Sequence, residues 1–96
     1  MEIITEAVGG EPYRYVPLGK HVVRAFGVCG GRPTFKYTRI EVEGTLGRLA
    51  AGETIASIIA GYDGRVTQEA VQEAIEIATR RLIETLPQMT ESSLAA

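Results

Sequence analysis

The sequence predicts a mainly α fold, a three-helix bundle that carries a short β-hairpin arm at its N-terminal side. Two observations support this class. Apolar residues alternate with polar ones before Val42, and they recur at helical spacing after it. Residues that commonly cap helices, namely Gly52, Thr54 and Thr67, divide the helical part into three.

The size of the chain is that of one structural domain. Its 96 residues leave no length for a second core, and 45% of them are hydrophobic. We expect an N-terminal arm at 1–41, a bundle at 42–87 and a flexible tail at 88–96.

The arm is expected to contain short strands. Its first eleven residues resemble a loose segment, and Pro17 and Gly19 predict a turn further along. The alternation predicts three strands, which are Tyr13–Val16, His21–Phe26 and Thr34–Ile40.

The helical part begins at Val42, and its first helix ends where Gly52 can serve as a C-terminal cap. Thr54 is expected to cap a second helix that ends near Gly61. Thr67 is expected to cap a third, from Gln68 to about Leu86, closed by Pro87. On that third helix, Glu69, Glu73, Glu76 and Arg80 form a stripe that predicts a solvated face.

The second helix is apolar or small on nearly every side, which predicts burial on more than one side. We therefore expect a homodimer that light scattering would detect. Its interface, or that with a protein partner, is assigned to Ile55, Ile58 and Ile59. A monomer in which the arm folds over this helix is the alternative.

The order of the helices is that of a three-helix DNA-binding bundle of the helix-turn-helix or homeodomain-like type. Cations and amides near the start of the third helix suit phosphates and base edges. The candidate DNA-binding residues are Arg32, Lys36, Arg65, Thr67, Gln68 and Gln72. The alternative is an ordinary capped helix with polar exposed residues. The DNA-binding hypothesis requires Arg32, Lys36 and Arg65 to share one face with the start of the third helix.

The stretch "CGGRPTFKYTRIEV" at residues 29–42 has two readings. Gly30 and Gly31 could present amides to an anion, or they could only permit a tight turn. In the second reading, Pro33 starts an edge strand, and Thr38 with Arg39 ties that strand to the first helix. We favour a structural role for Cys29, Gly30, Gly31, Pro33, Thr38, Arg39 and Gly52.

Catalysis has little basis in this sequence. His21 and Cys29 are the only histidine and cysteine, and neither has an identifiable acid, base or metal-ligand partner. We expect no enzyme activity, no metal and no cofactor. A single cysteine, no apolar leader and no run of membrane-spanning length predict a cytoplasmic protein that does not contact membranes.

The residues just named also carry a resemblance to a family. The Cys29-Gly30-Gly31 turn, the "TRI" triplet at Thr38, "LAAGETIASIIAGY", "RVT" and "EAIEIA" are similar to the domain-of-unknown-function family 433, described as VapB-type antitoxin-like. The segment before them, "YRYVPLGKHVVRAFG", resembles the longer members, which have an N-terminal β-arm. The family commonly has glycine before Thr38. Tyr37 stands there instead, so we expect the strand to continue through it.

Two functions follow from these observations. The first is a DNA-binding regulator of antitoxin type, acting with a toxin-like protein from an adjacent gene, as the resemblance implies. The second is a protein-interaction or dimerisation module that does not bind DNA.

Overall fold

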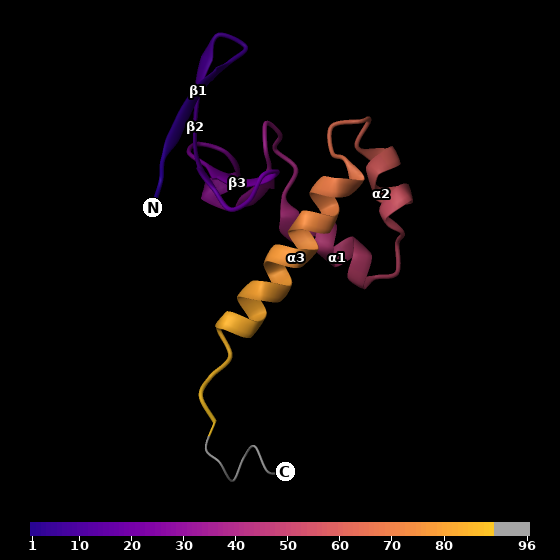
Figure 1. Cartoon of the computed structure of the whole chain (residues 1–96). Coiled ribbons are helices and arrows are strands. Elements are labelled where there is room, and N and C mark those ends of the chain that lie inside the picture. Colours follow the sequence, from indigo (N-terminus) through magenta and orange to yellow (C-terminus); the bar gives the residue numbers. More distant parts are fainter. Residues whose placement is uncertain (90–96) are drawn as a thin grey trace.

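The computed structural model describes residues 1–89, which form one antiparallel sheet followed by three helices (Figure 1). The sheet has the strand order β1-β2-β3-β4. The elements are β1 (Ile4–Val8), β2 (Glu11–Pro17), β3 (Val22–Ala25), the 3-10 turn η1 (Cys29–Gly31), β4 (Pro33–Phe35), α1 (Val42–Ala50), α2 (Ile55–Gly61) and α3 (Gln68–Glu84).

The predicted fold class is wrong, because the chain is a mixed α/β fold and not a mainly α bundle. Of the described residues, 40% are helical and 22% are in strands. The error began at the N-terminus, where the segment expected to be loose forms β1 and enters a hairpin. Val8 pairs with Glu11 across a two-residue loop, in which Gly9 and Gly10 have φ of 59° and 83°. Gly-Gly between two strands is a signal for this tight hairpin turn, and it was present in the sequence.

α2 and α3 begin at the predicted caps. The Thr54 hydroxyl accepts a hydrogen bond from the Ser57 amide, and the Thr67 hydroxyl accepts one from the Ala70 amide, both at 3.1 Å. Gly52 follows α1 with φ of 100°, a conformation that other residues rarely adopt. α3 ends at Glu84, two residues before the predicted end.

The main core lies between the sheet and the helices. Val22 and Phe35 from the strands pack into one buried cluster with residues of α1, of α3 and of the loop before α3, which are Val42, Val66, Ala70, Val71 and Ala74. The sheet is therefore not an appendage of the bundle. It supplies one wall of the core that the helices cover.

The opposite face of the sheet carries a smaller core and a polar cluster. Val23 and Tyr15 are buried there. Glu6 accepts hydrogen bonds from the hydroxyls of Tyr15 at 2.5 Å and Tyr37 at 2.6 Å, and the Lys36 ammonium lies 3.7 Å from it. These contacts fasten β1 to the chain that follows β4.

Tyr37 corrects the prediction that β4 continues through it. The strand ends at Phe35, and Tyr37 has φ of 68°, a left-handed conformation usual for glycine. Its amide donates to the Tyr13 hydroxyl at 3.0 Å, and its ring lies 5.3 Å from the Tyr13 ring. These contacts, with the bond to Glu6, hold the strained turn in place.

We expect Glu6→Gln to reduce the dependence of stability on acid pH. The hydrogen bond from Tyr15, and then that from Tyr37, hold the pKa of Glu6 below its ordinary value of 4.5. A carboxyl with a lowered folded pKa stabilises the protein above its unfolded pKa, and this contribution is lost as pH falls through the folded pKa. Urea unfolding at a series of pH values, from neutral to below 4.5, would measure this contribution to the free energy of unfolding. Glu11→Gln, on the exposed start of β2, is the matched control. If the free energy of unfolding depended on pH equally in the two variants, the role of Glu6 would be contradicted.

Candidate functional site

A hollow of about 310 Å³ brings basic side chains together from three segments that are distant in the sequence. These segments are the turn between β2 and β3, the end of β4, and the loop that leads into α3. No acidic residue is among the described residues that line it. The lining is Lys20, His21, Phe35, Lys36, Tyr37, Arg65, Val66, Thr67 and Ala70.

Lys20 and His21 reach the hollow because the β2–β3 turn is fixed from two sides. Within the turn, the amides of Leu18 and Gly19 donate to the Val22 carbonyl at 2.9 and 3.1 Å. From α3, the Glu73 carboxylate accepts the Lys20 amide at 2.9 Å and the His21 amide at 2.6 Å. Glu73 thus holds the β2–β3 turn, which forms one wall of the hollow, by accepting hydrogen bonds from its backbone amides.

Glu73 was predicted to be part of a solvated stripe, but it docks α3 onto this turn. Gly19 makes the approach possible, since a Cβ there would lie 2.7 Å from the Glu73 carboxylate carbon. Helical periodicity could not reveal this contact. The partner is more than 50 residues away in the sequence.

Lys36 and Arg65 form the other side of the hollow. The Lys36 amide donates to the His21 carbonyl at 2.8 Å, which joins the end of β4 to the turn. The Lys36 ammonium is paired with the Glu6 carboxylate at 3.7 Å, and the Tyr15 hydroxyl is the main contact that raises the pKa of Lys36. Arg65 is exposed, and its Nε donates to the Tyr62 carbonyl at 3.3 Å. Within residues 1–89, neither Lys20 nor Arg65 forms an ion pair.

The predicted DNA-binding residues separate into two groups. Lys36, Arg65 and Thr67 line the hollow, as the hypothesis needs. Gln68 and Gln72 are exposed, but at about 100° per residue they point to the side of α3 opposite Ala70, which lines it. Lys20 and His21 complete the site, and sequence reasoning missed them because no local pattern relates them to α3.

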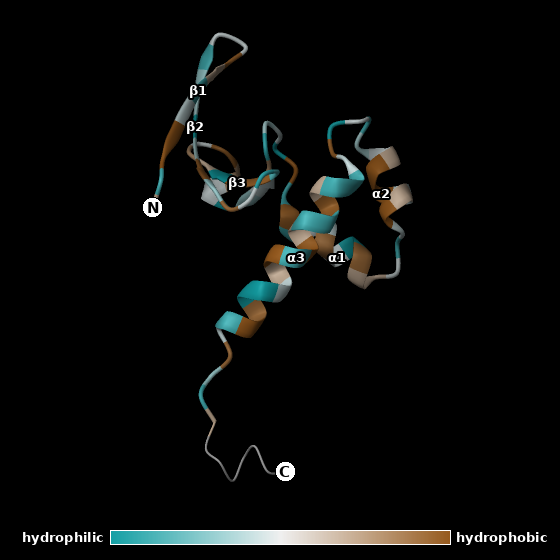
Figure 2. Cartoon of the chain, in the orientation of Figure 1, coloured by the Kyte–Doolittle hydropathy of each residue, from teal (hydrophilic) through white to brown (hydrophobic). Residues whose placement is uncertain are grey.

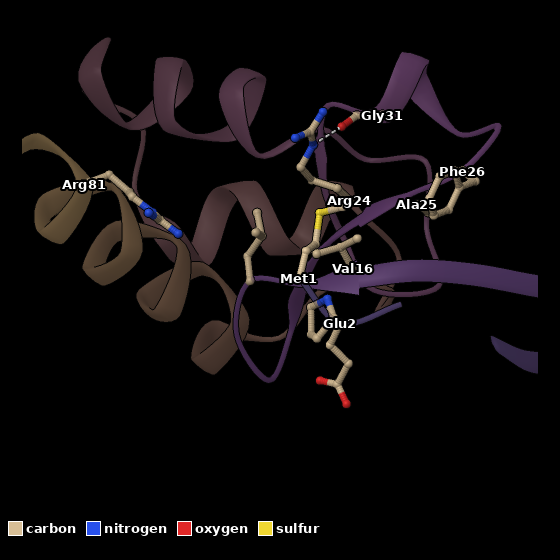
Figure 3. Close-up of a pocket in the computed structure, with 10 residues that line it drawn as sticks. Met1, Glu2, Val16, Arg24, Ala25, Phe26, Gly31 and Arg81 are labelled. Atoms are coloured by element: carbon tan, nitrogen blue, oxygen red, sulfur yellow. Dashed lines mark hydrogen bonds between the residues drawn. The ribbon is translucent and has the colours of Figure 1, made fainter. Parts of the chain in front are cut away.

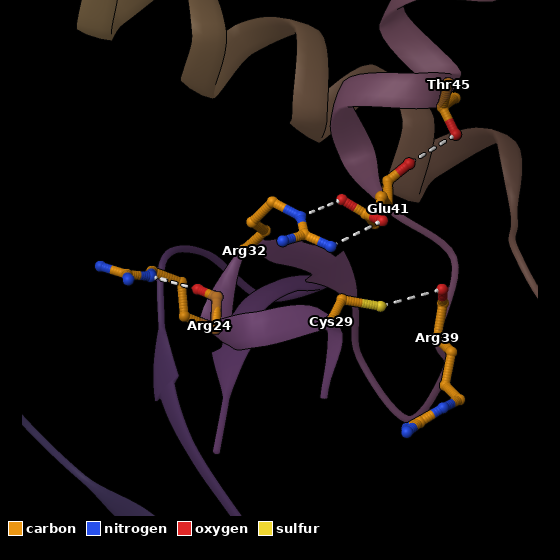
Figure 4. Close-up of polar contacts among 7 residues, drawn as sticks. Arg24, Cys29, Arg32, Arg39, Glu41 and Thr45 are labelled. Carbon is orange, nitrogen blue, oxygen red and sulfur yellow. Dashed lines mark hydrogen bonds and ion pairs between the residues drawn. The ribbon is translucent and has the colours of Figure 1, made fainter. Parts of the chain in front are cut away.

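Arg32 does not join the hollow, so the requirement that it share a face with Lys36 and Arg65 is not met. Its guanidinium pairs with the Glu41 carboxylate at 2.7 and 3.4 Å, just before α1 (Figure 4). This pairing raises the pKa of Arg32 and lowers that of Glu41. The ion pair connects the start of β4 to the start of α1.

Backbone amides at the Cys29–Gly31 turn donate hydrogen bonds to carbonyls of the same turn. Cys29, Gly30 and Gly31 all have positive φ. The Gly31 amide donates to the Val28 carbonyl at 2.9 Å, and the Arg32 amide to the Cys29 carbonyl at 3.1 Å. These bonds support a tight turn, and they remove the Gly31 amide from an anion nest.

The rest of the 29–42 stretch also makes structural contacts, and Pro33 opens β4 as expected. The Cys29 thiol donates to the Arg39 carbonyl at 3.4 Å, while the Arg39 side chain points away from this contact (Figure 4). Thr38 closes the turn after β4, because its hydroxyl donates to the Phe35 carbonyl and accepts from the Ile40 amide. Arg39 therefore acts through its backbone.

The isoleucines of α2 face the interior of the same chain. Ile58 is 0% exposed, and Ile55 and Ile59 are half-buried against the main core. In this structure they do not offer the apolar surface that was assigned to a partner. The exposed side of α2 presents small residues such as Ala56 and Ala60.

Two apolar clefts flank Leu18 and have a different character from the basic hollow. One, of about 450 Å³, lies between β3 and the chain start and includes Val16, Phe26 and Arg81 (Figure 3). The other, of about 420 Å³, is lined mainly by apolar residues such as Val22 and Leu46, with Arg32, Glu43 and Arg81 also present. Their lining suits apolar groups, so they are poor candidates for holding phosphate.

No helix within 1–89 has the length and apolar character that a membrane span needs. The same residues hold no group of three or more histidine, cysteine, aspartate or glutamate side chains placed to bind a metal ion.

Comparison with known proteins identifies the family. The model of the family described as "Protein of unknown function (DUF433)" matches residues 22–78, which is more than half of the chain. The protein belongs to the DUF433 family. No curated protein and no solved structure matches the chain. The DUF433 match includes Lys36, Arg65 and Thr67, whereas Lys20, His21, the β1–β2 hairpin and the C-terminal part of α3 lie outside it.

Proposed function

We propose that the protein is a DNA-binding regulator of antitoxin type, in which Lys20 and His21, rather than Arg32, join Arg65 in the basic hollow that holds the phosphate backbone. The observation that carries the proposal is the convergence of Lys20, His21 and Arg65 on one hollow without an acidic lining residue, beside Lys36, whose ammonium is paired with Glu6. Ammonium and guanidinium groups bind phosphate through charge-assisted hydrogen bonds. The exposed Arg65 guanidinium keeps donors available for this purpose.

The position of Gln68 and Gln72 shapes the expected mode of binding. They lie on the far side of α3 from the hollow, so they do not contact the bases beside a phosphate held there. The proposed binding therefore depends mainly on the backbone, which carries little sequence information. A net charge of −2 limits the number of phosphates that one chain can neutralise. We expect modest affinity, with a partner protein from an adjacent gene adding to it.

The test is a titration of labelled DNA duplexes of unrelated sequence at several salt concentrations. Each neutralised phosphate contributes about −0.9 to the slope of log K against log salt. Lys20→Ala and Arg65→Ala should each weaken binding to a similar extent for every duplex. Each should also make the slope of log K against log salt shallower by the contribution of about one phosphate. Lys36→Ala should have a smaller effect on the slope, because the Lys36 ammonium is already paired with Glu6.

Arg80→Ala is the matched control, because it removes the same charge about 20 Å along α3 from Thr67, at 1.5 Å per residue. It should leave the slope unchanged, and so should Gln68→Ala. Equal effects of Arg80→Ala and Arg65→Ala would show that only net charge matters. Absence of binding at low salt, with and without the adjacent gene's product, would reject the proposal.

A second function, protein interaction without DNA binding, is favoured by a different observation. Leu82, Ile83 and Leu86 near the end of α3 are each more than half exposed. Large apolar side chains grouped in this way are typical of interaction surfaces.

A further inference from the structure

The two apolar clefts adjoin each other between the sheet and the C-terminal half of α3. This half of α3 projects away from the body of the protein (Figure 1), and hydrophobic and hydrophilic residues alternate along it (Figure 2). The clefts, of about 420 and 450 Å³, share Leu18, just after β2, and Arg81 of α3. They therefore meet at these two residues. We call the two clefts together the α3 groove.

One face of α3 forms a wall of the α3 groove. The residues of this wall are Ala74, Ile77, Ala78 and Arg81. At about 100° per residue, they fall within about 100° of one another around the helix. Ala74 is buried in the main core, whereas Ala78, one turn further on, is exposed. The groove thus extends from solvent to the edge of the core, and its small alanine side chains leave space beside the helix.

Arg24 lies on the opposite wall. It is two residues from Val22, which packs in the main core, so both side chains lie on the face of the sheet that the helices cover. Its Nε donates to the Gly31 carbonyl at 2.5 Å (Figure 3). Among residues 1–89 it forms no ion pair. The other nitrogens of its guanidinium keep donors for an anion.

Arg81 brings a second guanidinium to the same cleft. It points from α3 into the cleft, whereas the Glu2 carboxylate points away from both arginines (Figure 3). Its ion pair with Glu84, at 3.5 Å, joins two largely exposed side chains. Such surface pairs are weak, so a bound anion can compete with Glu84 for Arg81.

The charge differs between the two ends of the α3 groove. Beside α1, Glu43 lines the groove, and Arg32 there is bound to the Glu41 carboxylate. Towards the chain start, the lining includes Arg24 and Arg81. An anionic group is therefore favoured at the arginine end, and an uncharged chain suits the end beside α1.

We propose that the α3 groove binds an aliphatic carboxylate, with its carboxylate at Arg81 and Arg24 and its hydrocarbon chain past Leu18 into the cleft beside α1. Mostly apolar clefts of about 300–1,000 Å³ with a few polar groups are typical of small-molecule sites. Guanidinium groups bind carboxylates through charge-assisted hydrogen bonds. The apolar lining adds affinity for the hydrocarbon chain, which an inorganic anion lacks.

This site is separate from the proposed DNA-binding site. The α3 groove and the basic hollow have no lining residue in common among the described residues. Lys20→Ala should therefore bind the carboxylate as the wild type does, and failure of DNA binding would leave this inference unaffected.

The first test is calorimetric titration of the full chain with octanoate and decanoate, below the concentrations at which they form micelles. Each should bind with a stoichiometry of one per chain. Decanoate should bind about 15-fold more tightly, because each buried methylene contributes about fourfold. Absence of saturable binding, or equal affinity for the two acids, would overturn the inference.

The second test separates the carboxylate from the hydrocarbon chain. Arg81→Gln should weaken decanoate binding about fivefold and leave the binding of decan-1-ol unchanged. Arg39→Gln is the matched control, because Arg39 is exposed and lines neither cleft, and it should bind both probes as the wild type does. Equal losses for decanoate and decan-1-ol in Arg81→Gln would overturn the assignment of the carboxylate.

The third test fills the groove. Ala78→Leu should weaken the binding of both probes by about tenfold or more, with unchanged thermal unfolding, because the added side chain occupies the space of the hydrocarbon chain. Ala56→Leu makes the same change on the exposed side of α2 and should have no effect. Ala78→Met repeats the test if the leucine variant is poorly folded. Wild-type affinity in a folded Ala78 variant would show that the hydrocarbon chain does not lie in the α3 groove.

Discussion

Phe35→Ala should remove a large share of the free energy of unfolding. The ring is 2% exposed and joins the sheet to the core under the helices, and it also lines the basic hollow. Truncating a buried phenylalanine costs about 3–5 kcal/mol, because apolar contacts are lost and a cavity remains. Small domains have only about 5–15 kcal/mol of total stability. Urea unfolding followed by far-ultraviolet circular dichroism would measure the loss.

Phe26→Ala is the matched control for this prediction. Phe26 is 51% exposed at the end of β3, and its main contact is the Arg14 guanidinium, 4.7 Å from the ring centroid. Such an exposed cation–π contact is worth about 0.5–1 kcal/mol. Similar losses for both variants would show that the sheet and the helices do not share one core.

Glu73→Ala should cost about 2–3 kcal/mol, although glutamate on a helix surface is ordinarily dispensable. The change removes two charge-assisted hydrogen bonds and leaves the amides of Lys20 and His21 without this acceptor. Glu76→Ala, one turn away on the exposed side of α3, should change the free energy of unfolding by less than about 0.5 kcal/mol. Equal effects would show that Glu73 does not dock the turn.

Gly19→Ala provides a coupled test of the same contact. The added Cβ would collide with the Glu73 carboxylate and approach the Ile77 side chain at 3.0 Å. With alanine at 73 most of this collision is absent, so the two substitutions together should cost less than the sum of their separate effects. Additive costs would contradict the geometry. Because the turn carries Lys20 and His21, loss of Glu73 should also disorder one wall of the hollow and weaken DNA binding.

The sequence alone determined features whose interactions are local. The starts of α2 and α3 were predicted correctly because the bonds of Thr54 and Thr67 close within three residues. Gly52 ended α1 for a similarly local reason. The hairpin at Gly9 and Gly10 was also encoded locally, but its signal was outweighed by the irregular pattern around it, and this led to the wrong fold class.

Tertiary structure decided how the elements meet, since those contacts join residues that no local pattern relates. Glu73 has the spacing of a solvent-facing residue, yet the sheet places amides within its reach. Tyr37 takes a glycine-like conformation because Tyr13 and Glu6 bond it there. Of the six predicted DNA-binding residues, only Lys36, Arg65 and Thr67 came together. The physical reason is the sequence separation of the interacting groups. Caps and turns are completed by neighbouring backbone groups, whereas the hollow forms only after the strands and helices have packed around one core.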